Sequence, residues 1–268
     1  MSALDLGGLC RLAEAAARAG GEVVLAGFAD PSNVREKSPG DWVSDVDTAS
    51  ETAVAAVLAE GAPDLAFFGE ESGGERGALG WICDPLDGTA NFLHRFPSVG
   101  VSIALVEDGV PIVGVVHAPL LGTTYTATRG GGAFQDGVPM RVSTRGPDRA
   151  MVATGFPFRH EDLKDPYLGI FGRALRRFED LRRAGAASLD LAWTAAGVFD
   201  GYFELRLGPW DVAAGALLVR EAGGVVTDWS GDDRAWLDSG DIVVGPAEVH
   251  AEILALAAES GLTGSGVQ

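Results

Sequence analysis

Apolar side chains near the N-terminus recur every three or four positions. Between residues 6 and 16, leucines and alanines keep this spacing, with charged residues among them. Because this is the period of one helix face, the pattern predicts an α-helix. A second helix is expected to begin near Thr48, since Thr48 and Glu51 stand three apart, as the two members of a capping box do.

The pattern then changes to short apolar runs typical of strands. Leu65 to Phe68 and Gly80 to Cys83 are each bounded by polar or turn-forming residues. Three longer runs follow at Val99 to Val106, Pro111 to Val116 and Thr123 to Thr128, with glycine-containing turns between them. Consecutive strands joined by short turns indicate an antiparallel sheet.

From about Met151, helical and strand patterns alternate. We expect two domains, residues 1–143 and 144–268, that share a cleft. The stretch from Gly261 to Gln268 is of low complexity and is expected to be a tail. The remaining predicted elements are helices at 165–177, from Ala186 and from Trp210, and strands at 202–205, 225–228 and 242–245.

Composition narrows the class of partner. The formal net charge is −18 over 268 residues, which disfavours nucleic acid and anionic membranes as primary partners. No apolar stretch is long enough to cross a bilayer, and charged residues interrupt any secretory signal near the N-terminus. Two cysteines and four histidines without zinc-binding spacing favour a reducing cytoplasm, no disulfide framework and no zinc site.

Two carboxylates three positions apart follow the buried run that ends at Cys83. They belong to Asp84-Pro85-Leu86-Asp87-Gly88-Thr89, which we expect to turn from a strand into a helix beginning near Gly88. Carboxylate and carbonyl oxygens suit Mg²⁺, and unpaired amides at Gly88 and Thr89 suit a phosphate. The alternative is an Asx-type turn in which Asp84 and Asp87 only cap the helix.

Three further segments with acidic residues allow both a functional and a plain structural interpretation. Glu70 and Glu71 follow a short strand, where such a pair is usually part of a solvated loop. Asp47 stands at a helix start, where it is either an N-cap or a catalytic partner. Asp211 lies in the first turn of a helix, and the helix dipole favours an acid there in any case.

Taken together, these segments resemble the inositol monophosphatase family of lithium-sensitive, Mg²⁺-dependent phosphatases. The resemblance extends over nearly the whole chain. It is carried by Gly-Glu-Glu-Ser at 69–72, the Asp84–Thr89 segment with Asn91-Phe92, and Trp210-Asp211-Val212-Ala213-Ala214-Gly215 continuing to Glu221-Ala222-Gly223-Gly224. It implies a layered α/β fold with alternating α-β-α-β-α layers, a homodimer, and an active site between the two halves of each subunit.

The resemblance also implies a role for each matching residue. The ligands of a first Mg²⁺ would be Glu70, Asp84 and the Leu86 carbonyl, and those of a second would be Asp84, Asp87 and Asp211. Glu70 would also contact a third, weaker ion. Asp47 and Thr89 match the pair that orients the attacking water and helps to deprotonate it. The amides of Gly88 and Thr89 would hold the phosphate.

The residues that match the substrate side are Gly185, Ala187 and Glu204, with Asp87 and Asp211 assisting. Glu204 suits vicinal hydroxyls or a cationic amine, but it is equally well explained as an exposed acid at a strand end. Ala187 stands where relatives commonly place Ser or Thr, which weakens the expectation of a polyol. Arg182 and Arg183 either contact a second phosphate or lie at a subunit interface, and we favour the interface.

Two classes of function follow from the resemblance. The first is hydrolysis of a small phosphorylated metabolite by Mg²⁺-activated water. The best candidate substrate is inositol 1-phosphate, with histidinol phosphate, fructose 1,6-bisphosphate and a 3′-phosphonucleotide as alternatives. The second is a regulatory protein of the same fold that acts by binding. The intact acidic set favours the first.

Overall fold

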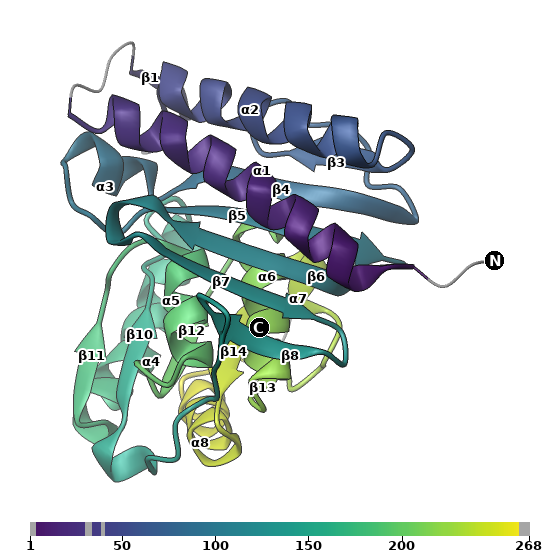
Figure 1. Cartoon of the computed structure of the whole chain (residues 1–268). Coiled ribbons are helices and arrows are strands. Elements are labelled where there is room, and N and C mark those ends of the chain that lie inside the picture. The colour runs from purple at the N-terminus through teal and green to yellow at the C-terminus, as the bar shows by residue number, and fades with distance from the viewer. Residues whose placement is uncertain (1–3, 30–33, 39–40, 263–268) are drawn as a thin grey trace.

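Five stacked layers of helices and sheets build the chain (Figure 1). The computed structural model describes residues 4–29, 34–38 and 41–262. Helices α1 (Leu6–Gly27) and α2 (Asp45–Gly61) form the first layer and pack on each other and on one face of a seven-stranded sheet. The expected tail lies outside the described residues from 263 onward.

The seven-stranded sheet is a meander in which neighbouring strands pair in sequence order. All pairs are antiparallel except the first, in which β3 runs parallel to β4. This confirms the antiparallel sheet that the strand pattern predicts after residue 99. The strands are β3 (Ala66–Gly69), β4 (Leu79–Asp87), β5 (Gly100–Glu107), β6 (Val110–Ala118), β7 (Thr123–Thr128), β8 (Gly132–Gln135) and β9 (Val138–Pro139).

Side-chain alternation along β5 explains why this sheet is covered on both faces. Ile103 and Leu105 belong to the hydrophobic cluster under α1 and α2, whereas Ala104 and Val106 belong to the cluster on the opposite face. Successive strand residues point to opposite faces, so an uninterrupted apolar strand needs a partner layer on each side. Here the second partner layer is helical.

Helices α5 (Ala187–Ala195) and α6 (Pro209–Glu221) form this middle layer. A five-stranded sheet, ordered β11-β10-β12-β14-β13, lies on their other side. Helices α4 (Lys164–Arg177) and α8 (Ala247–Glu259) cover its outer face. The strands are β10 (Met151–Thr154), β11 (Asp180–Arg182), β12 (Gly201–Glu204), β13 (Val225–Thr227) and β14 (Ile242–Gly245).

The start of α2 differs from the prediction. The helix begins at Asp45, and its capping box joins Ser44 and Asp47, not Thr48 and Glu51. Glu51 is buried, and its carboxylate accepts hydrogen bonds from the backbone of the 70–72 loop instead. Smaller elements complete the described chain: β1 (Arg35–Ser38), β2 (Asp41–Val43), α3 (Thr89–Leu93), α7 (Trp236–Ser239), and the short helical turns η1 (Pro119–Leu121), η2 (Pro147–Arg149) and η3 (Glu161–Leu163).

The expected boundary near residue 144 falls between the two sheets, after β9 and before β10. One hydrophobic cluster nevertheless contains residues from both sides of it, Ile82 and Ala104 with Leu189 and Ile242 among them. The division into two domains therefore stays a prediction. Within the described ranges, no helix is long and apolar enough to span a membrane.

Candidate active site

A β-bulge in β4 brings the first two carboxylates to the same face. Asp84 pairs with Ser102 of β5 and Asp87 pairs with Gly100, so two residues of β4 lie opposite the single residue between these partners. In a regular strand, residues three apart point to opposite faces. The extra residue of the bulge restores a common direction. The strand thus continues through Asp87 and does not end at Asp84 as expected, and α3 follows Gly88 as predicted.

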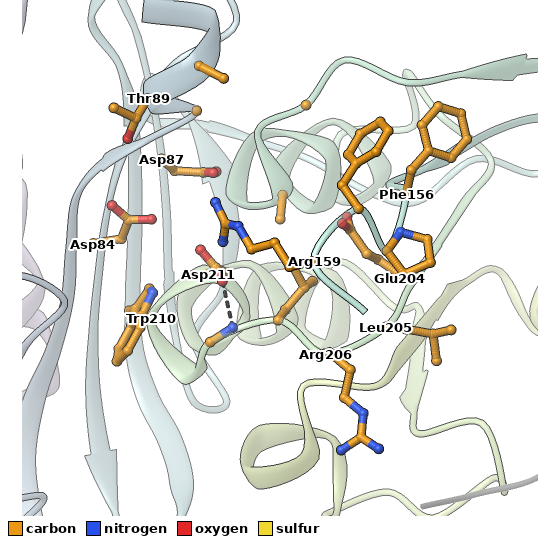
Figure 2. A pocket seen from close by; sticks show the side chains of 18 of the residues that line it. Asp84, Asp87, Thr89, Phe156, Arg159, Glu204, Leu205, Arg206, Trp210 and Asp211 are labelled. Atoms are coloured by element: carbon orange, nitrogen blue, oxygen red, sulfur yellow. Dashed lines mark hydrogen bonds between the residues drawn. The ribbon is translucent and has the colours of Figure 1, made fainter. Parts of the chain in front are cut away.

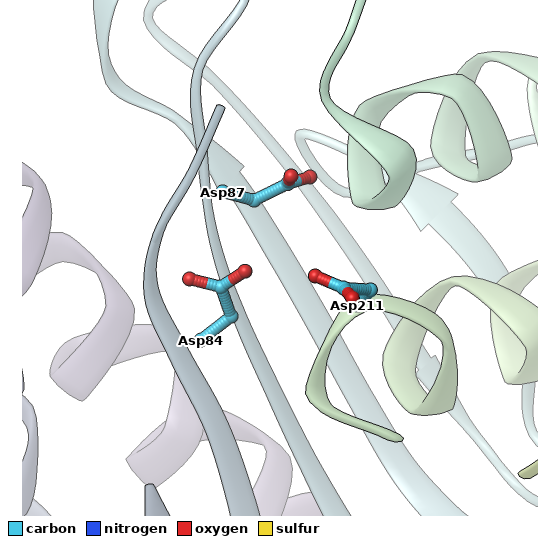
Figure 3. Close-up of side chains that lie close together, drawn as sticks. All are labelled: Asp84, Asp87 and Asp211. Atoms are coloured by element: carbon cyan, nitrogen blue, oxygen red, sulfur yellow. The ribbon is translucent and has the colours of Figure 1, made fainter. Parts of the chain in front are cut away.

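Asp211 completes a cluster of three carboxylates (Figure 3). One oxygen from each of Asp84, Asp87 and Asp211 lies within 4.8 Å of the others. Asp211 is in the first turn of α6, where its Oδ2 accepts a hydrogen bond of 2.7 Å from the Gly208 amide. Pro209 occupies the first turn, where a missing amide hydrogen does no harm. The fold thereby joins two acids of the first sheet to one from the middle layer.

The cluster is electrostatically unfavourable when no cation is bound. Burial, then the charges of Glu70, Asp87 and Asp211, raises the pKa of Asp84 well above its usual range. Burial and neighbouring acids do the same to the pKa of Asp211. Burial also raises the pKa of Asp87, although hydrogen bonds from the Ser188 amide (2.7 Å) and hydroxyl (2.5 Å) favour its ionised form. Bound cations would relieve this repulsion.

The donor set fits a hard divalent cation. Asp84 and Asp87 are buried and Asp211 is half-buried, and carboxylate oxygens that converge in this way, with no histidine or thiol among the three, are typical of Mg²⁺ sites. Glu70 lines the same pocket, outside the group of three, and its charge contributes to the raised pKa of Asp84 and Asp211. Leu86 also lines the pocket, and the Thr89 hydroxyl lies 3.3 Å from the Leu86 carbonyl oxygen. All five residues expected to hold metal therefore surround one pocket.

Thr89 and Asp47 form the pair expected from the resemblance. The Thr89 hydroxyl donates to Asp47 Oδ1 at 3.0 Å, while Asp47 Oδ2 accepts from the amide (2.8 Å) and hydroxyl (2.6 Å) of Ser44. Thr89 lines the pocket, and Asp47 is only 2% exposed. Burial raises the pKa of Asp47, and hydrogen bonds from Ser44, Thr89 and its own backbone oppose that rise. The two interpretations of Asp47 are therefore compatible: it caps α2 and also contacts Thr89.

Gly88 shapes the floor of the pocket. Its φ of +91° lies in the left-handed region, and a Cβ there would come within 2.8 Å of the Ser98 carbonyl oxygen. Only glycine adopts this conformation without strain and leaves the backbone open. Gly88 and Thr89 both line the pocket, at the end next to the three carboxylates.

The residues expected to contact the alcohol part of a substrate line the same pocket as the three carboxylates. The cavity has a volume of about 590 Å³, and Gly185, Ala187 and Glu204 line it, as expected. Figure 2 shows Glu204 on the side away from Asp84. The Tyr202 hydroxyl donates to the half-buried Glu204 carboxylate, and burial raises the pKa of Glu204 to about 7. Glu204 is therefore not the freely exposed acid of the plain interpretation.

The structure separates the two neighbouring arginines. Arg183 lines the pocket, and its guanidinium lies over the rings of Phe156 (5.9 Å) and Phe158 (5.5 Å). Arg182 pairs with Asp180 at 2.6 Å. An interface role was expected for both, and a single chain does not test it.

Two features of the site were missed in the sequence. The segment from Phe156 to His160 lines the pocket, although its aromatic and basic residues carry no recognisable spacing. Gly155 precedes it, and a Cβ at this position would lie 1.9 Å from the Glu204 carboxyl carbon, so glycine is what leaves room for that group. The second feature is Glu51, whose oxygens accept from the amides of Glu71 (2.9 Å) and Ser72 (2.8 Å) beside Glu70. Its burial, which shows this role, is visible only in the structure, so the sequence offered no signal for it.

Comparison with known proteins agrees with this geometry. Residues 7–262 match the family model of the inositol monophosphatase family. The chain belongs to the inositol monophosphatase family. The layered α/β architecture expected from the resemblance is likewise confirmed by the solved structures described next.

Relatives within this family carry two kinds of name. The chain is 41% identical over 253 residues to the Nus factor SuhB of Escherichia coli, covering 92% of this chain and 94% of that protein. The crystal structure of extragenic suppressor protein suhB from Bartonella henselae has a TM-score of 0.89 at 36% identity and covers 93% and 98% of the two chains. A Thermotoga maritima IMPase has a TM-score of 0.85 at 33% identity and covers 92% and 95%.

Proposed function

We propose that this family member hydrolyses a small phosphomonoester with the help of two or three Mg²⁺ ions. The best candidate reaction converts inositol 1-phosphate to inositol and phosphate. One observation supports the proposal most strongly. Carboxylate oxygens of Asp84, Asp87 and Asp211 lie within 4.8 Å of one another in the pocket that Gly88 and Thr89 also line. We also propose a cytoplasmic homodimer.

The chain's own residues would position water and handle its proton. Bound Mg²⁺ supplies a water of lowered pKa and stabilises negative charge on the ester oxygens. Asp84, Asp87, Asp211, Glu70 and the Leu86 carbonyl would hold the ions. The Thr89 hydroxyl, hydrogen-bonded to Asp47 at 3.0 Å, would orient the water and pass its proton toward the Asp47 carboxylate. The amides of Gly88 and Thr89 would donate to the phosphate.

The alcohol part of the substrate would lie against Gly185, Ala187 and Glu204, with Asp87 and Asp211 near its hydroxyls. Glu204 accepts hydrogen bonds from hydroxyls when ionised and pairs with an amine as readily. Ala187 supplies no hydroxyl of its own. Histidinol phosphate, fructose 1,6-bisphosphate and a 3′-phosphonucleotide therefore stay as alternative substrates.

The test is Mg²⁺-dependent phosphate release from a panel of these four esters and NADP. One strongly preferred ester would identify the substrate. Asp84→Asn should abolish turnover, because it removes the ligand shared by both proposed ions, and it should leave the melting temperature of the metal-free protein equal or higher, because one of several repelling acids is gone. A variant that keeps the wild-type rate would disprove the assignment of Asp84.

A regulatory binding function is a second candidate, favoured by the Nus factor name of the Escherichia coli relative. The net charge of −18 argues against direct RNA contact, so we propose a protein partner in this case. Binding of the purified chain to the transcription complex of its own organism tests this. Equal binding by the wild type and Asp84→Asn, with no activity on any ester, would replace the first proposal by the second.

A further inference from the structure

The loop between β10 and α4 forms part of the pocket wall and brings two basic residues, Arg159 and His160, to a pocket that several acids line. Phe156, Pro157, Phe158, Arg159 and His160 all line the pocket. None of these positions belongs to the family motifs or to the residues proposed above for metal, water or alcohol.

This loop is anchored at both ends. Phe156 packs edge-on against Tyr167 and Phe171 of α4, with ring centroids 5.7 and 5.6 Å apart. Leu163 is buried at 4% exposure in the short helical turn η3 that leads into α4. An anchored loop presents its intervening side chains at a small entropic cost.

The basic residues of the pocket differ in direction. Figure 2 shows the Arg159 side chain pointing into the pocket, toward Asp84, Asp87 and Asp211, whereas Arg206 points away from these acids. Arg183 packs on the rings of Phe156 and Phe158. The Arg183 charge also acts on Asp87, so Arg159 and Arg183 are both near the acids, but only Arg159 comes from the 156–160 loop.

The balance of charges in the pocket indicates what the Arg159 guanidinium would bind. Glu70, Asp84, Asp87 and Asp211 carry four negative charges when ionised, which two divalent ions would cancel. A bound phosphomonoester dianion would then add two negative charges, in a chain whose net charge is already −18, and the arginines that line the pocket are the groups that can balance them. Guanidinium groups bind such oxygens with two parallel hydrogen bonds and stay charged at every working pH.

We propose that Arg159 binds the phosphoryl group of the substrate and of the product phosphate. Its guanidinium donates hydrogen bonds to phosphoryl oxygens. This role rests on the proposed phosphatase function, but it concerns phosphate binding, which is measurable without turnover. It makes Arg159 a specificity residue for the anionic group.

The first experiment is calorimetric titration of inorganic phosphate into the Mg²⁺-saturated protein. Arg159→Gln should weaken phosphate binding by about 10- to 100-fold, the loss of a hydrogen-bonded charge pair. Arg159→Lys keeps the charge without the two-pronged geometry and should lie between the wild type and Arg159→Gln. Arg206→Gln is the matched control, since it removes one positive charge from the same pocket wall; it should change phosphate affinity by no more than about twofold.

The alternative is that Arg159 only compensates the carboxylates when no metal is bound. Titration of Mg²⁺ alone separates the two roles. Unchanged phosphate affinity in Arg159→Gln, together with tighter Mg²⁺ binding, would overturn the proposal. Equal losses of phosphate affinity in Arg159→Gln and Arg206→Gln would also overturn it, because the effect would then be one of general charge.

Kinetics with the preferred ester add a second readout. Arg159→Gln should raise KM for the ester and the inhibition constant for phosphate by similar factors. If the wild type hydrolyses no ester but still binds phosphate through Arg159, the phosphatase proposal fails and the Arg159 proposal stands. If the wild type hydrolyses an ester at a normal rate and Arg159→Gln leaves phosphate affinity unchanged, the phosphatase proposal stands and the Arg159 proposal fails.

Discussion

Ionisation of the clustered acidic residues of the site is unfavourable, and this lowers the stability of the metal-free fold. Burial and mutual repulsion raise the pKa of Asp84 and Asp211 well above the usual range of a carboxyl. Neighbouring donors reduce this cost where they are available, as Ser188 does for Asp87 and Ser44 for Asp47. Such an arrangement is typical of a site that is completed by a cation or a substrate.

Glu204 gives a testable pH dependence of stability. Burial raises its pKa from 4.5 to about 7, so the folded protein keeps a proton that the unfolded chain loses near pH 4.5. Its contribution to stability is therefore full below pH 4.5 and is lost as the pH rises through 7. Glu204→Gln cannot ionise and should gain melting temperature relative to the wild type across this interval. Melting curves in EDTA measure it, and a pH-independent difference between the two proteins would contradict the expectation.

At the scale of elements, local irregularities position the functional groups. The bulge in β4 aligns Asp84 with Asp87, and the N-terminus of α2 places Asp47 beside Thr89. One turn further along α2, Glu51 holds the loop that carries Glu70. Helix α2 therefore supports the site from two positions, although neither Asp47 nor Glu51 is exposed.

Glu51→Gln tests this support. The two oxygens of Glu51 now accept hydrogen bonds from two backbone amides. In the glutamine variant an NH₂ group would replace one oxygen, so two donors would face each other and stay without an acceptor. We expect a loss of about 1–3 kcal/mol in unfolding free energy and weaker Mg²⁺ binding through the displaced Glu70. Urea denaturation and Mg²⁺ titration measure the two effects. Glu60→Gln, at an exposed position of the same helix, should change neither.

At the scale of the whole molecule, the layers bring distant segments together. The middle helices α5 and α6 lie between the two sheets, so the first turn of α6 delivers Asp211 to β4 and the start of α5 delivers Ser188 to Asp87. Residues 101 positions apart in sequence thus form one hydrogen-bonded site.

Mg²⁺ should therefore stabilise the whole protein in a pH-dependent manner. Metal binding requires ionised carboxylates, whose raised pKa values disfavour ionisation, so Mg²⁺ affinity should increase with pH. At 100 times its dissociation constant, Mg²⁺ should add about 2.7 kcal/mol to the unfolding free energy. Thermal shifts at pH 6 and 8 measure this effect. A shift in Asp84→Asn as large as that in the wild type would show that the ion binds elsewhere.

The oligomeric state of the whole molecule needs a separate measurement. Sedimentation velocity should give a particle of twice the chain mass if the proposed homodimer forms. A mass equal to one chain, at concentrations well above those used for assay, would contradict it.

The sequence by itself indicated most of the elements and the candidate metal-binding residues. Apolar runs bounded by turn-forming residues located β5, β7 and β14, and a helical pattern located α4, to within a few residues, because these signals lie in neighbouring residues of the chain. The acidic motifs indicated a Mg²⁺ site because their oxygens are the ligands that ion prefers. These properties are local, so they are readable along the chain.

Only the tertiary structure decided how these residues meet. The sequence did not reveal that β4 bulges between Asp84 and Asp87, that Glu51 accepts hydrogen bonds from the 70–72 loop, or that Arg159 points at the acids while Arg206 points away. Each of these depends on contacts between segments far apart in the chain, where packing outweighs local preference. Direction and proximity of side chains follow from such packing, and so does the chemistry of the pocket.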